Sequence, residues 1–175
     1  MLTPGAVAQA CQDVIWSELS KRGVRRDDRS TWTTSLVRIS CPDGGPFVQA
    51  GTAQPVQEAF DQLLGPGRWW QREGVGGSVP VRFPSEQDPA DTGWHLDGGY
   101  ETNGQRRVNI RSRGAALLAL YLFSDVDERS APTRLRPGSH TAAHPSGLVP
   151  QPSRTGNTAQ PHLSDPYIAA AGGRR

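Results

Sequence analysis

Apolar residues recur at three- and four-residue spacing near the start of the chain, which predicts an amphipathic helix. Thr3 supplies a capping hydroxyl, Pro4 suits the first helical turn, and Gly23 ends the helix. A second helix is predicted from Pro55 to Gly65 by the same rule. The two apolar faces consist of Val7, Cys11, Val14, Ile15 and Leu19, and of Val56, Ala59, Phe60, Leu63 and Leu64.

Other segments carry the pattern of β-strands. Residues 31–40 are rich in β-branched and aromatic side chains, and residues 79–83 alternate around Pro80, which favours an edge strand. Residues 115–123 are continuously apolar, as in a strand buried on both faces, and 132–136 predict a further short strand. Two helices followed by strands predict a mainly β fold, a sandwich or jelly roll with helical cover.

Composition sets the domain organisation. A chain of 175 residues suits one domain, and 20 glycines with 15 prolines favour short strands and turns. Residues 42–46 are predicted to form such a turn. After Pro145 the chain is rich in Pro, Gly, Ser and Thr, so we predict one domain over residues 1–145 and an irregular tail over 146–175.

Charge and cysteine content limit the functional classes. The formal net charge of +2 gives no indication of nucleic-acid binding, and residues 22–29 mix arginines with aspartates, as a solvated loop would. The longest apolar run is too short to cross a membrane, and the N-terminus lacks the pattern of a signal peptide. Cys11 and Cys41 form neither a disulfide framework nor a CxxC pair, which indicates a reduced, cytoplasmic protein.

One stretch carries candidate chemistry, Gly-Trp-His-Leu-Asp-Gly-Gly-Tyr at residues 93–100. In an extended strand, residues two apart project from the same face, so His95 and Asp97 would converge on one point. An imidazole and a carboxylate are two of the three ligands in the facial triad that holds non-haem iron(II). The glycines that follow would let backbone or substrate come close.

Three motifs in this order resemble a known family. They are residues 93–98, the apolar strand at 117–126, and the block from Ala131 to His140 that contains Pro-Gly-Ser-His. Together they resemble the phytanoyl-CoA dioxygenase-like family of iron(II)/2-oxoglutarate oxygenases, over roughly residues 30–140. The resemblance implies a double-stranded β-helix, a cupin-like jelly roll, incomplete at its C-terminus. It also implies an oxidoreductase that couples oxidation of 2-oxoglutarate to hydroxylation of a small organic substrate.

The resemblance implies that His95 and Asp97 bind the iron. The family's third ligand, a histidine on a late strand, has few candidates here. His140 lies in a block that is normally a turn, and His144 and His162 are the other histidines beyond residue 100. The surroundings of His162 resemble those of the distal ligand, and Arg174 follows it as a candidate partner for the 2-oxoglutarate carboxylate.

The chain therefore looks C-terminally shortened relative to the family. Missing strands would expose the edge and faces of the apolar segment 115–123. Three consequences stay open, namely instability, a homodimer through that edge, and completion by another chain.

Several groups permit two interpretations. Arg107, Arg111 and Arg113 alternate with apolar residues, either as a solvated face or as a clamp for 2-oxoglutarate or an anionic substrate. The same holds for Arg134 and Arg136. Trp69 and Trp70 either anchor the core or offer a stacking platform to an aromatic substrate.

Two functional hypotheses follow. The first is a 2-oxoglutarate-dependent dioxygenase with iron(II) and a small-molecule substrate, without nucleic-acid or membrane partners. The alternative is a catalytically incomplete relic or ligand-binding module that keeps the frame without a complete triad. A third histidine within coordination distance of His95 and Asp97 would distinguish them.

Overall fold

The computed structural model describes residues 4–86, 100–102, 105–107, 117–128, 130, 132–135 and 167–172. Three α-helices and a short 3-10 helix lie mostly in the first third of the chain, and six short strands are interspersed and follow. In chain order the elements are α1 (Pro4–Ser20), η1 (Arg29–Thr31), β1 (Leu36–Ser40), α2 (Gly45–Gly51), α3 (Gln54–Leu64), β2 (Ser78–Arg82), β3 (Tyr100–Thr102), β4 (Gln105–Arg107), β5 (Ala119–Leu122) and β6 (Tyr167–Gly172).

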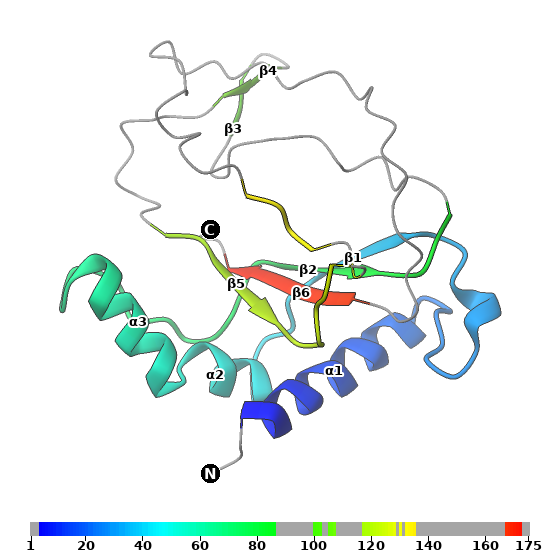
Figure 1. Cartoon of the computed structure of the whole chain (residues 1–175), viewed down its shortest axis with the longest axis horizontal. Coiled ribbons are helices and arrows are strands. Elements are labelled where there is room, and N and C mark those ends of the chain that lie inside the picture. Colours follow the sequence, from blue (N-terminus) through cyan, green and yellow to red (C-terminus); the bar gives the residue numbers. More distant parts are fainter. Residues whose placement is uncertain are drawn as a thin grey trace.

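The main sheet has four antiparallel strands in the order β1-β2-β6-β5. Figure 1 shows α1 and α2 on one side of this sheet and the small β3–β4 hairpin on the other. β6, drawn in red, comes from the end of the chain and lies between β2 and β5. The sheet therefore joins segments that are far apart in the sequence.

The predicted mainly β fold is wrong for the described part of the chain. Among the residues that the structure describes in full, 38% are helical and 14% are in strands. The helices α1, α2 and α3 hold 17, 7 and 11 residues, whereas the longest strand holds six. The helices α1 and α2, rather than a second sheet, cover one face of the main sheet, so neither a sandwich nor a jelly roll describes these elements.

Both predicted helices are present. α1 begins at Pro4 and presents Cys11, Ile15 and Leu19, which are fully buried, to the sheet. α3 ends at Leu64, and Gly65 follows with a positive φ of 93°, a conformation that glycine adopts without steric cost. Periodicity and terminal residues were sufficient to predict these two elements.

A third helix begins within the turn predicted at residues 42–46, whose first three residues stay non-helical. α2 begins at Gly45 and has Pro46 in its first turn, where the missing backbone N–H costs nothing. Its Phe47 is buried, and the Phe47 ring packs edge-on against Phe123 with 5.5 Å between centroids. Burial of this one aromatic side chain gives a seven-residue helix its tertiary support.

β2 lies inside the sheet, not at an edge as Pro80 had indicated. Its register with β1 is continuous from Ser78 to Arg82, whereas its register with β6 omits Val79 and Pro80. A proline has no N–H to donate, so it is accommodated where the ladder is interrupted. Val79 and Val81 are fully buried against the helices.

Two predictions about the later chain also differ from the structure. The tail predicted to be irregular contains β6, which pairs with both β2 and β5. β5 lies within the apolar segment 115–123, but Leu120 is 38% exposed and Leu122 is 53% exposed, so the strand is not buried on both faces. Residues 132–135 are exposed and form no strand.

An aromatic cluster joins α1, the loop before β1, and the end of β2. Trp16 lies on α1, Trp32 follows η1, and Phe83 comes directly after β2. The Phe83 ring lies 5.3 Å from that of Trp32 and 6.1 Å from that of Trp16. The cluster closes one end of the core that α1 and the sheet enclose.

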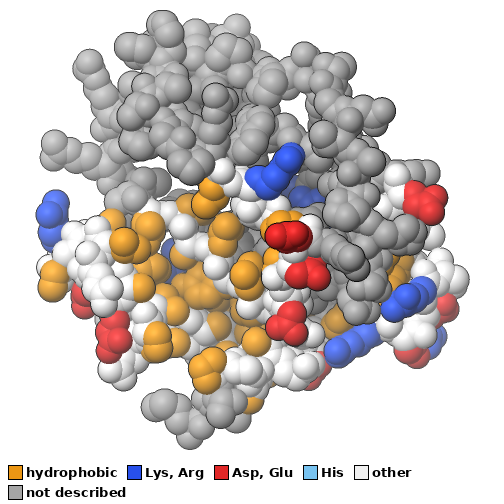
Figure 2. Space-filling model, viewed as in Figure 1, with side chains coloured by type: hydrophobic (Ala, Val, Ile, Leu, Met, Phe, Trp, Pro, Cys, Tyr) orange, Lys and Arg blue, Asp and Glu red, His pale blue; other side chains and the backbone are white. Residues whose placement is uncertain are grey.

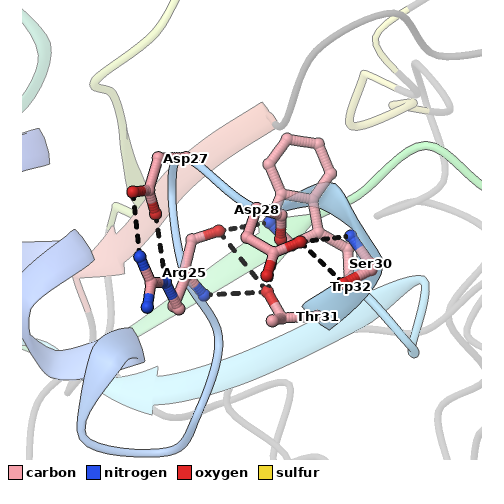
Figure 3. A network of polar contacts seen from close by, with 6 residues as sticks. All are labelled: Arg25, Asp27, Asp28, Ser30, Thr31 and Trp32. Atoms are coloured by element: carbon pink, nitrogen blue, oxygen red, sulfur yellow. Dashed lines mark hydrogen bonds and ion pairs between the residues drawn. The ribbon is translucent and has the colours of Figure 1, made fainter.

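A network of polar contacts fixes the loop between α1 and β1 (Figure 3). Arg25 donates two hydrogen bonds to the carboxylate of Asp27, at 3.2 and 3.0 Å. Asp28 caps η1 by accepting from the backbone N–H of Ser30, and the indole of Trp32 donates to the carbonyl of Arg25 at 2.7 Å. The hydrogen bonds from Arg25 lower the pKa of the exposed Asp27 carboxyl.

The remaining arginines of this loop are also used locally. Arg26 pairs with Asp13 of α1 at 3.1 Å and lies over the Trp16 ring. Arg29 lies over the ring of Trp32. These contacts agree with the predicted solvated loop and give the arginines internal roles.

Both cysteines are free and buried in the core. Burial, together with the neighbouring Cys41, raises the pKa of Cys11 to about 12, and burial raises the pKa of Cys41. Because the thiolate is the reactive form, a high pKa and burial both slow modification.

We therefore expect neither cysteine of the native protein to react with Ellman's reagent at pH 8 within minutes, and both to react at once in 6 M guanidinium. The absorbance of the released thiolate measures this directly. Rapid reaction of one thiol in the native protein would contradict the burial of that residue.

Candidate functional site

The predicted metal ligands and the three arginines assigned to the cosubstrate lie outside the described residues. This holds for His95 and Asp97, for the third-ligand candidates His140, His144 and His162, and for Arg111, Arg113 and Arg174. None of the four histidines of the chain is in the described part. The assignment of these residues to a metal or cosubstrate site therefore stays a prediction.

The structure does describe both ends of the segment that carries the His-x-Asp motif. On one side, Phe83 follows β2 with a buried ring, and its N–H donates to the carbonyl of Ser35 at 3.0 Å. On the other side, Tyr100 begins β3 and pairs with Arg107 of β4. Residues 87–99 thus connect a strand end anchored in the core to a hairpin on the opposite side of the sheet from the helices (Figure 1).

The two faces of the main sheet differ in chemistry. Val37, Ile39, Val79 and Val81 share the face that packs on the helices, since the register pairs Val37 with Val81 and Ile39 with Val79. The other face receives the alternate residues of each strand. These are Leu36, Arg38, Ser40, Ser78, Pro80, Arg82, Leu120 and Leu122, and we call this surface the outer face.

The outer face combines two arginines with apolar side chains. Arg38 of β1 is exposed and Arg82 of β2 is half-buried, and they occupy neighbouring strands. Leu120 and Leu122 lie on the same face at the other end of the sheet, two strands from β2. The face thus has a basic side and an apolar side.

Arg38 and Arg82 were not singled out in the sequence. The sequence nevertheless contained a signal, because each arginine lies between two apolar residues that point to the opposite, core-facing side of the sheet. Arg82 also comes 13 residues before His95 (95 − 82 = 13), at the point where the chain leaves the sheet toward the motif. A planar guanidinium is well suited to bind a carboxylate through two hydrogen bonds.

A buried polar group lies on the helix side of β5. The hydroxyl of Tyr121 is buried and has no hydrogen-bond partner among the residues that the structure describes, although its ring packs against the core. Burial raises the pKa of this phenol, and the positive charge of Arg72 lowers it in part. Arg72 itself donates to the backbone carbonyls of Gly74 and Val75, at 3.1 and 2.5 Å.

The adjacent tryptophans have different roles. Trp69 packs edge-on against Phe60 of α3 with 5.1 Å between centroids, and its indole donates to Asp61 at 2.8 Å. Trp70 is 79% exposed. Trp69 therefore anchors the end of α3, as one interpretation of the sequence held, and only Trp70 is exposed enough to meet a ligand.

The described ranges contain neither a metal-binding cluster nor a helix suited to cross a membrane. No group of three or more His, Cys, Asp or Glu side chains in those ranges could hold a metal ion. No helix there has the length and apolar character needed to cross a membrane. No family model, curated protein or solved structure matches this chain.

Proposed function

We propose that this protein is a non-haem iron(II)- and 2-oxoglutarate-dependent dioxygenase that hydroxylates a small organic substrate. The observation that carries this proposal is the His-x-Asp motif at residues 93–98, followed in order by the apolar segment that contains β5 and by the Pro-Gly-Ser-His block. We propose the chemistry alone, because the described helices contradict the jelly roll of the family that these motifs resemble.

The donor set of the motif suits the metal. Neutral imidazole and carboxylate are ligands that iron(II) accepts, and a facial triad leaves positions open for a cosubstrate. In the proposed site His95 and Asp97 bind the metal and His162 supplies the third ligand. Bound iron(II), with 2-oxoglutarate and dioxygen, would supply the oxidising chemistry, while the protein positions the substrate.

Arginine side chains would hold the carboxylate of 2-oxoglutarate. Arg111, Arg113 and Arg174 are the candidates from the sequence, and Arg82 joins them because it lies on the outer face where the chain departs toward the motif. Leu120 and Leu122 on the same face would offer apolar contacts to the organic substrate.

A small-molecule substrate is thus the first partner in this proposal. A second copy of the chain at the sheet edge is the other, and a cytoplasmic location accords with the two free cysteines.

The test is anaerobic titration of the purified protein with iron(II) and 2-oxoglutarate. We expect a visible charge-transfer band, one iron per chain, and succinate formation when oxygen is admitted. His95→Ala and Asp97→Ala each remove one ligand, and we expect iron binding at least about a hundredfold weaker, since loss of an outer-sphere partner alone costs up to that much.

Matched controls separate the motif from general effects of mutation. Asp91→Ala makes the same substitution at an unassigned aspartate, and His144→Ala removes a candidate histidine that the proposed triad leaves out. We expect both controls to keep the band and the turnover, and His162→Ala to lose them. A folded wild-type protein that binds no iron(II) would refute the dioxygenase and favour the non-catalytic ligand-binding alternative.

A further inference from the structure

We draw no further inference here: the strongest candidate, the apolar surface patch over α2, α3 and β5 (Figure 2), carries none, because nothing in the part of the chain that the structure describes shows what covers it.

Discussion

Replacing Phe83 by alanine is expected to destabilise the fold by about 3–5 kcal/mol, the range measured for buried aromatic residues. Phe83 is fully buried, and its ring contacts both Trp16 and Trp32. The substitution leaves a cavity at the junction of α1, β1 and β2, where three elements would have to move together to fill it. Since a domain of this size is stable by only about 5–15 kcal/mol, this is a large fraction of the total.

Guanidinium unfolding followed by tryptophan fluorescence measures this effect, because two of the tryptophans lie against the lost ring. Phe60→Ala is the matched control. Phe60 packs on Trp69 outside the main core cluster, so its loss should cost clearly less. A Phe83→Ala variant that loses less than about 1 kcal/mol would show that this junction contributes little to the core.

The position of Phe83 also links the core to the proposed site. It is the last buried residue described before the segment 87–99, so the same side chain that closes the core fixes where that segment begins. We therefore place the mutation in a structural role, and its effect on any activity should follow the loss of stability.

The elements that could be predicted from the sequence are those with enough length to show a period. α1 and α3 have apolar residues on one face over several turns. β1 and β5 fall within the predicted strand segments, and β2 begins one residue before its predicted segment, 79–83. α2 was missed because seven residues that begin Gly-Pro look like a turn, and only burial of Phe47 makes them a helix.

β6 was missed for a different reason. Its sequence is Tyr-Ile-Ala-Ala-Ala-Gly, and alanine and glycine have low preference for strands. Its strand conformation comes from pairing with β2 and β5, which lie more than 40 residues earlier in the chain. Pairing with strands so distant in the chain leaves no local pattern in the sequence. Pro80 likewise lies inside the sheet because β6, from a distant part of the chain, pairs with β2.

The candidate site was predicted by a motif and not by periodicity. His95 and Asp97 are only two residues apart, so their common direction follows from local extended geometry. The third ligand depends on how residues far apart in the chain meet, which no local rule provides. The described part adds Arg82 and the outer face to the site hypothesis, and the metal ligands stay a prediction.

Replacing Gly51 by alanine is expected to destabilise the protein by about 3 kcal/mol or more, because the new methyl group has no space. A Cβ at this position would overlap the carbonyl group of Gly74 and lie 2.5 Å from the backbone nitrogen of Val75. These are backbone atoms, so no side-chain rotation can relieve the clash. Val75 is fully buried, and Arg72 holds both carbonyls of this loop, so the loop cannot move away without losing those contacts.

Gly5→Ala makes the same substitution in α1, where a Cβ meets nothing within 4 Å. We expect this control to stabilise the protein slightly, by about 0.5–1 kcal/mol at most, since alanine loses less backbone entropy than glycine in a helix. Thermal and guanidinium unfolding give the free energy of unfolding of both variants. We expect the steric clash to lower it in Gly51→Ala and the higher helix propensity of alanine to raise it in Gly5→Ala. If Gly51→Ala unfolds at the wild-type midpoint, α2 and the loop at residues 72–76 do not pack as closely as the structure has them. The close contact between Gly51 of α2 and the backbone of Gly74 and Val75 would then be wrong.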